Sequence, residues 1–408
     1  MIEMSLNRWL RWTVVAAGIA VVAATFALPG RNARGAGAAP MATSMTRAAD
    51  LRVTLSNLLA EHTALAASAT AGALGGRTAL FRGAAAALDA NSDDVIRAVG
   101  GVYGEDAGRA FGPLWKKHIG FVVDYTTGLA TKDRTKQERA VNDLLAYTQE
   151  LGAFLSSATK SLPASAVADL VKMHVLTLKD VIDAQAAEVP GREFAAVRRA
   201  YSHMGMIAEP LAGAISKQFP SRYPGSVDGP AVGLRVTLNT LFAEHVYLAA
   251  RATGAALGGR QIEFRAAAAA LDGNSDDIIR AVASVYGEDA GRAFGPLWKK
   301  HIGFVVDYTT GLATKDRTKQ ERAVNDLLAY TQELGAFLSS ATKSLPASAV
   351  ADLVKMHVLT LKDVIDAQAA GNAPKVYVEL RRAMGHMGML ADPLAEAIVK
   401  QFPERFSR

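Results

Sequence analysis

The stretch "LRVTLSNLLAEH", Leu51–His62, decides the fold, because it recurs almost unchanged as "LRVTLNTLFAEH" at Leu234–His245. The offset of 183 residues holds without a gap to the two "QFP" motifs that end at Pro220 and Pro403. Between these limits, residues 102–187 are identical to residues 285–370. Such self-similarity indicates a tandem duplication of a domain-sized unit.

Each repeat is predicted to be helical throughout. Alanine is abundant, apolar residues recur at spacings of three and four, and the alternation typical of strands is absent. In the first repeat we expect helices over 50–72, 77–101, 105–130, 134–158, 163–187 and 191–218. The second should break at "DANSDD", with Ser92 as an N-cap, and Pro113 and Pro210 should each start or kink a helix. The sequence therefore predicts an all-α fold of two tandem helical bundles with about six helices each.

The domain boundaries follow from the repeat and from composition. The segment "SRYPGSVDGPAVG", 221–233, is rich in proline and glycine and is predicted to be the linker between the bundles at 50–220 and 234–408. Residues 40–49 are expected to form an N-terminal linker that precedes the first bundle. Everything before them, residues 1–39, has the features of a signal peptide and leader.

That leader begins with a basic segment, "MIEMSLNRWLRW", followed by the apolar run "TVVAAGIAVVAATFAL" of 16 residues. The run is shorter than a comfortable membrane span and typical of a secretory signal, with cleavage between about Leu28 and Met41. An uncleaved anchor is the alternative. No later segment is apolar enough to span a bilayer, and the chain contains no cysteine. We therefore expect an exported protein, in the periplasm, the cell envelope or the medium, without disulfides.

Charge and motifs exclude several functions. The formal net charge is +6, and about half of it lies in the leader, so the remainder is too weak and scattered for a nucleic-acid surface. The sequence has no HExxH, EF-hand, Walker or GxSxG motif, so neither hydrolytic nor nucleotide chemistry is predicted. A ferritin-like di-iron centre would need a carboxylate three residues before a histidine, and none is present. No catalytic residue is predicted.

One resemblance covers nearly all of each repeat. An early "EH", the motif "YGEDAG", then "KKHI", "HMGM" and "QFP" resemble a recurrent pattern in exported bacterial all-helical proteins without an assigned activity. The resemblance implies secretion and a helical fold, here duplicated in tandem. It implies nothing about chemistry.

The histidines carry the functional prediction. Each repeat has four, one on each of four expected helices, flanked one turn away by mostly apolar residues and placed near mid-helix. A single histidine on such a face is ordinarily a core residue, but four inward-facing imidazoles without a cation need many hydrogen-bond partners. We therefore predict one four-histidine metal centre per repeat, formed by His62, His118, His174 and His203 and by His245, His301, His357 and His386.

Ligand chemistry narrows the metal to copper or zinc. Imidazole suits zinc, copper, nickel and iron, and the thioethers of Met206 and Met389, one turn from a histidine, would favour copper as additional ligands. Possible supporting groups around the ligands are Glu61, Glu244, Thr177 and Thr360. Protonation should release the ion as the pH falls through about 6.5.

Two alternatives remain open at this stage. Two of the four histidines could hold a haem in a slot lined by Trp115, Phe121 and Tyr125, which would make the protein a redox or electron-transfer protein. Alternatively, the histidines could be structural, in an interaction protein of the cell envelope whose partners are unknown. The prediction that we carry forward is an exported protein that binds a transition metal.

Overall fold

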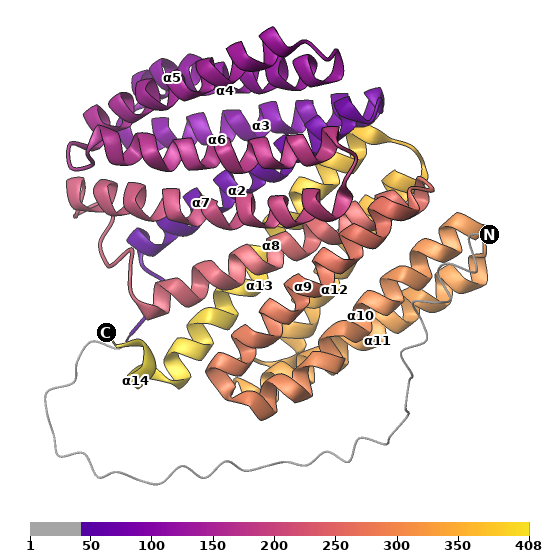
Figure 1. The fold of residues 1–408 in the computed structure, drawn as a ribbon. Coiled ribbons are helices and arrows are strands. Elements are labelled where there is room, and N and C mark those ends of the chain that lie inside the picture. Colours follow the sequence, from indigo (N-terminus) through magenta and orange to yellow (C-terminus); the bar gives the residue numbers. More distant parts are fainter. Residues whose placement is uncertain (1–41, 408) are drawn as a thin grey trace, which may run out of the picture. The chain divides into compact units, whose positions relative to one another are not determined.

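The computed structural model describes residues 42–407, and this part of the chain is built from thirteen helices without a strand. The first repeat contains α2 (Arg47–Leu74), α3 (Thr78–Tyr103), α4 (Glu105–Ala130), α5 (Arg134–Thr159), α6 (Ala164–Ala186) and α7 (Pro190–Gln218). The second contains α8 (Pro230–Leu257), α9 (Gln261–Tyr286), α10 (Glu288–Thr314), α11 (Arg317–Ala341), α12 (Ala347–Ala369) and α13 (Ala373–Gln401), with the short α14 (Pro403–Phe406) at the end. The predicted all-α fold of two six-helix bundles is confirmed (Figure 1). The predicted signal peptide lies outside the described residues.

Local sequence explains where these helices begin and end. The Thr46 hydroxyl accepts a hydrogen bond from the Ala49 amide at 3.1 Å, and the Asp133 carboxylate accepts one from the Lys136 amide at 2.9 Å, so both residues are N-caps. After α2 the chain turns at Gly76, whose φ of 65° is a conformation that glycine adopts without strain.

Three local predictions differ from the structure. The break expected at "DANSDD" is wrong, because α3 continues through it. The expected N-cap Ser92 is buried instead, and its hydroxyl donates to the Leu88 carbonyl at 2.9 Å. Pro113 and Pro210, each of which should start or kink a helix, both lie inside helices, which leaves the second alternative. The last residues of the predicted linker, from Pro230, belong to α8.

The six helices of each repeat form a closed ring. Each helix packs against the next along the chain, and the last packs against the first: α7 against α2, and α13 against α8. Within the first ring, the alternate helices α2, α4 and α6 also contact one another. Because consecutive helices in such a ring run antiparallel, these three point in the same direction. They form the interior of the bundle, and the candidate site lies among them.

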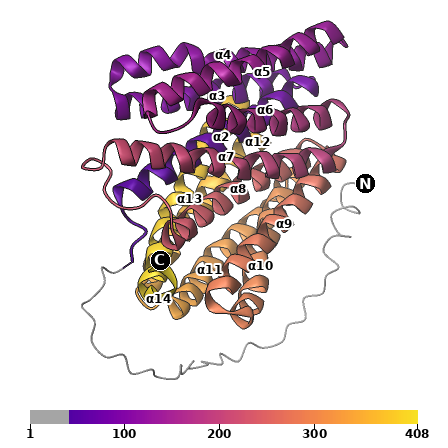
Figure 2. The same cartoon turned by 60° about the vertical axis from the view of Figure 1, so that its left-hand side comes forward.

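The two rings pack on each other through equivalent surfaces. Helix α2 contacts α8, and the pairing of α3 with α13 is matched by that of α9 with α7 (Figure 2). A small core between the rings consists of Ala49, Val53, Val232 and Val236, which are two pairs of equivalent positions. This is the isologous arrangement of a two-fold symmetric dimer, here within one chain.

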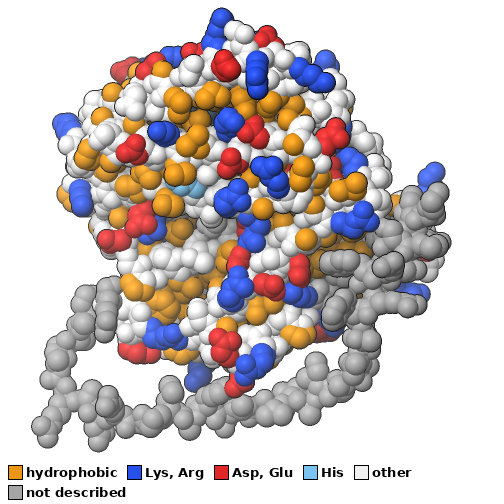
Figure 3. Space-filling view, in the orientation of Figure 1, with side chains coloured by type: hydrophobic (Ala, Val, Ile, Leu, Met, Phe, Trp, Pro, Cys, Tyr) orange, Lys and Arg blue, Asp and Glu red, His pale blue; other side chains and the backbone are white. Residues whose placement is uncertain are grey.

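None of the described helices has an apolar stretch long enough to cross a bilayer. On the face shown in Figure 3, lysine and arginine side chains are interspersed with aspartate and glutamate, and hydrophobic side chains lie between them.

Candidate metal centre

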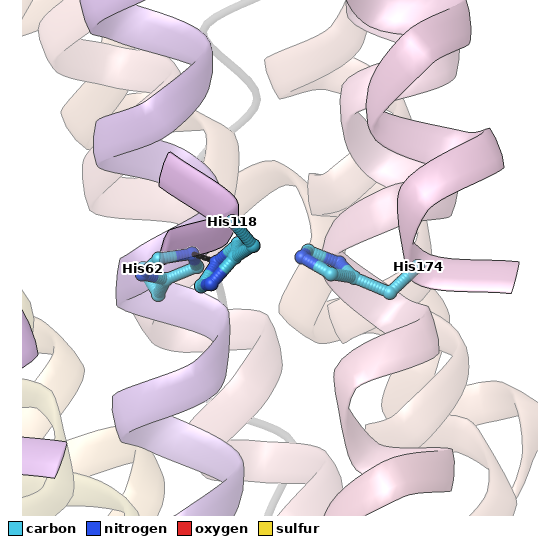
Figure 4. Close-up of side chains that lie close together, drawn as sticks. All are labelled: His62, His118 and His174. Atoms are coloured by element: carbon cyan, nitrogen blue, oxygen red, sulfur yellow. Dashed lines mark hydrogen bonds between the residues drawn. The ribbon is translucent and has the colours of Figure 1, made fainter. Parts of the chain in front are cut away.

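Three histidines of each repeat converge in the interior. His62, His118 and His174 lie on α2, α4 and α6, and they are 2%, 5% and 8% exposed. In Figure 4 the His174 ring points from its helix toward His62 and His118 on the other side. One nitrogen from each ring lies within 4.8 Å of the other two, and His245, His301 and His357 repeat this arrangement. Both clusters could therefore hold a metal ion.

The closest approach within each cluster is between two Nε2 atoms. They are 3.2 Å apart for His62 and His118, and 3.2 Å apart for His245 and His301. In a tetrahedral site with metal–nitrogen bonds of about 2.0–2.1 Å, two ligand nitrogens lie about 3.3 Å apart. The spacing of the pair is thus that of two imidazoles on one tetrahedral ion.

Hydrogen bonds at the other ring nitrogens fix which nitrogen carries the hydrogen. The Nδ1 of His118 contacts the carbonyl oxygen of Trp115, which only accepts, so this nitrogen donates. In the second repeat the Nδ1 of His245 lies 3.3 Å from Oδ1 of Asn274. The Asn274 amide nitrogen is already donating to the Leu241 carbonyl and to Glu244, which leaves Oδ1 as the acceptor. His245 therefore also carries its hydrogen on Nδ1.

In the second cluster Nδ1 of His301 likewise contacts the Trp298 carbonyl, so two Nε2 lone pairs face each other there; in the first cluster the two Nε2 atoms have the same spacing, and Nδ1 of His62 has no hydrogen-bond partner among the described residues. In a buried site, two acceptors at 3.2 Å repel unless a cation lies between or beside them. A shared proton would require an imidazolium, but burial lowers the pKa of His118 to about 4, and that of His301 to about 4. At neutral pH a bound metal ion would satisfy these lone pairs, whereas the proton does not.

The third histidine and the surrounding aromatic rings leave polar atoms without partners. Burial, with the charges of His118 and His203 adding to it, lowers the pKa of His174 to about 3. The His174 Nδ1 is buried and has no hydrogen-bond partner among the described residues. The same holds for Nε1 of Trp115, whose ring lies 4.9 Å from those of both His62 and His118, and for the hydroxyl of Tyr147, which stacks on His118. Orphaned polar atoms of this kind are expected where an ion or a small ligand is bound.

A chain of polar contacts supports the site from the second repeat. Asn91 lies beside His62, and its amide nitrogen donates to Glu61 at 2.7 Å. Glu61 in turn accepts from Arg381, which belongs to α13. In the second centre, Asn274, Glu244 and Arg198 form the same series of polar contacts, and the arginine again belongs to the opposite repeat. Groups of this kind orient a ligating imidazole and fix its tautomer.

The predicted four-histidine centre is a three-histidine cluster in the structure. His203 is on α7, which packs against α2 and α6 at the side of the ring. Its Nε2 lies 3.0 Å from the Leu170 carbonyl, and His386 makes the equivalent contact with Leu353 at 3.0 Å. Because that nitrogen is used by a backbone carbonyl, neither residue joins the group of three.

The other predicted site residues also take different places. Met206 and Met389 are 60% and 61% exposed, so their sulfurs lie on the surface and not beside the buried imidazoles. The hydroxyls of Thr177 and Thr360 donate to backbone carbonyls of their own helices, including those of His174 and His357. Glu61 and Glu244 reach the histidines only through the asparagines. Asn91 itself was missed, because it lies in the segment predicted to break the helix.

Comparison with protein families, with curated proteins and with solved structures found no match for this chain. The functional argument therefore rests on the geometry of the two histidine clusters.

Proposed function

We propose that this protein is an exported metal-binding protein that holds one transition-metal ion in each repeat through three buried, neutral imidazoles. The observation that carries the proposal is the approach of two buried imidazole Nε2 atoms to 3.2 Å in each cluster. The first repeat would bind through His62, His118 and His174, and the second through His245, His301 and His357. The first 39 residues, with the features of a signal peptide, would direct the chain out of the cytoplasm.

Zinc is the ion that we favour. The sequence-based argument for copper used the thioether of Met206, but that side chain is 60% exposed. What remains is an all-nitrogen set of three ligands with near-tetrahedral spacing, which suits zinc and is also used by copper, nickel and iron. A small ion also fits the available space better than haem, because the cavity beside the cluster has a volume of only about 20 Å³.

The test is metal analysis by inductively coupled plasma mass spectrometry of protein purified from the periplasm of an expression host. We expect about two equivalents of one transition metal per chain, one for each three-ligand centre. The double variant His118→Ala with His301→Ala should bind almost none. The matched double variant His203→Ala with His386→Ala should bind as much as the wild type.

Two results would contradict the proposal. If the wild type neither contains nor takes up zinc, copper, nickel or iron, the histidines serve only as core residues. If the His203 and His386 variant loses its metal as completely as the His118 and His301 variant, the centre has four ligands and the three-ligand arrangement is wrong. Circular dichroism of each variant checks that the helical fold is retained.

A further inference from the structure

A small cavity adjoins two of the three histidines of each cluster. In the first repeat it is bounded by His118 and His174 and by apolar side chains of α4, α5 and α6, including Leu144 and Val175. His62 does not line it. The equivalent cavity in the second repeat is bounded by His301 and His357, and both have a volume of about 20 Å³. This is space for about one water-sized molecule.

The cavity lies where a fourth ligand would have to be. Three imidazoles occupy three positions of a tetrahedral ion, and the fourth imidazole of the repeat, His203, is engaged with a backbone carbonyl. On the side of the cluster formed by His62, Asn91 lies beside the ring and donates to Glu61, and His62 does not line the cavity. The open side is therefore the one between His118 and His174, where the cavity begins.

The rim of the cavity is polar, in contrast to its apolar walls. Tyr125 donates to Asp183 at 2.6 Å, Lys179 donates to the same carboxylate at 2.7 Å, and the lysine ammonium lies 5.2 Å from the centre of the tyrosine ring. The side chains of Lys179 and Asp183 are 33% and 34% exposed, so Lys179, which lines the cavity, also reaches solvent. Tyr308, Asp366 and Lys362 form the same group in the second repeat.

We propose that each bound metal keeps an open fourth coordination position that faces this cavity and takes one small ligand, either water or a small anion that replaces it through one atom. The inference rests on the proposed metal centre and adds the class of molecule that the centre would bind. A three-histidine ion with an exchangeable water is arranged as in metal sites that activate small molecules, whereas a structural metal site is closed by a fourth protein ligand.

The test uses protein loaded with Co²⁺, whose visible absorption reports on its ligands, and azide as the probe. For the wild type we expect a spectral change that saturates at about one azide per centre. The double variant Val175→Ile with Val358→Ile adds a methyl group to each cavity, and we expect it to weaken azide binding at least about tenfold with Co²⁺ content unchanged. The matched control, Val123→Ile with Val306→Ile, changes valines on α4 and α10 that do not line the cavities, and it should bind azide as the wild type does.

A second variant keeps the test decisive if the isoleucine variant does not fold. Leu144→Ala with Leu327→Ala enlarges both cavities. We expect this variant to bind added imidazole, a ligand that is too large for the wild type. If Co²⁺ is bound but its spectrum changes neither with azide in the wild type nor with azide or imidazole in the enlarged variant, the ion has no open position and this inference fails while the proposed function stands. If the wild type takes up no Co²⁺, the metal centre itself is wrong.

Discussion

Arg381 of the second repeat donates from Nε and Nη2 to the two carboxylate oxygens of Glu61 in the first repeat, each at 3.1 Å. Arg198 of the first repeat makes the same pairing with Glu244 of the second, at 3.2 and 3.3 Å. Each glutamate directly precedes a histidine of the cluster and holds the asparagine beside it. The outer support of each centre is thus completed by the other repeat, which gives the duplication a structural role.

Replacing Arg381 should weaken the first centre more than the second. The variant Arg381→Ala leaves the partly buried Glu61 without its cation, while Asp94 keeps its pairing with Arg97, so we expect a loss of about 1–3 kcal/mol in the free energy of unfolding. Metal affinity should fall about 10-fold at one of the two centres. Denaturant titration and metal titration measure the two effects. The control is Arg382→Ala on the same helix, where the arginine is 58% exposed and little should change.

The asparagine beside each cluster should control metal affinity directly. In the variant Asn91→Leu the acceptor next to His62 is lost, and we expect the affinity of the first centre to fall by about 10- to 100-fold. The variant Asn91→Asp retains an acceptor at the same place and should retain most of the affinity. Competition with a chromophoric chelator distinguishes the two. Equal affinities for both variants would show that Asn91 does not orient His62.

Acid should destabilise the metal-free protein. Burial lowers the pKa of His118 from 6.5 to about 4, and it is the main cause that lowers the pKa of His174 to about 3. Between these values and pH 6.5 the unfolded chain therefore binds more protons than the folded one. The free energy of unfolding of the metal-free protein is therefore highest above about pH 6.5, and it decreases progressively as the pH falls toward 4 and 3. Thermal unfolding with chelator, followed from pH 8 to pH 4, measures this. The variant His118→Leu with His301→Leu should show a weaker dependence on pH.

The same pKa values change the expected pH of metal release. The sequence alone predicts release near pH 6.5, the ordinary pKa of histidine. Burial in the folded protein lowers the pKa of His118 to about 4, so protons should compete with the metal only at lower pH. We expect the ion to be retained below pH 6 and released together with acid unfolding. Metal content after dialysis at a series of pH values tests this, and release centred at pH 6.5 with the fold intact would contradict it.

Metal binding should also raise the thermal stability of the chain. A ligand that binds only the folded state at a free concentration of about 100 times its Kd contributes about 2.7 kcal/mol per site. Adding zinc to the metal-free wild type should therefore raise the Tm, and the gain should disappear in the His118→Ala with His301→Ala variant. The His203→Ala with His386→Ala variant serves as the control and should keep the full gain.

The sequence by itself determined the helices and the pool of candidate ligands. Helix formation depends on nearest neighbours, capping groups and apolar spacing, all of which are local, so five of the six expected helices of the first repeat agree with the structure to within about three residues at either end. The sixth, α3, lacks the break that was expected at Asn91 and Ser92, two residues that favour the start of a helix. They stay inside the helix because burial against α2 gives Asn91 the Leu58 carbonyl as a partner. Only a tertiary contact could decide that.

The tertiary structure decided which histidines meet. His62 and His118 are 56 residues apart, and His118 and His174 are separated by the same interval, which is one helical hairpin. Each interval of 56 residues passes through one antiparallel helix and reaches the next helix that runs in the original direction, at the same level along the bundle axis. The three imidazole rings therefore meet inside the bundle. His203 follows His174 by a single antiparallel helix and comes to lie at the side of the ring. The equal spacing was visible in the sequence, but its meaning depends on the closure of α7 onto α2, a long-range packing that residue periodicity does not encode.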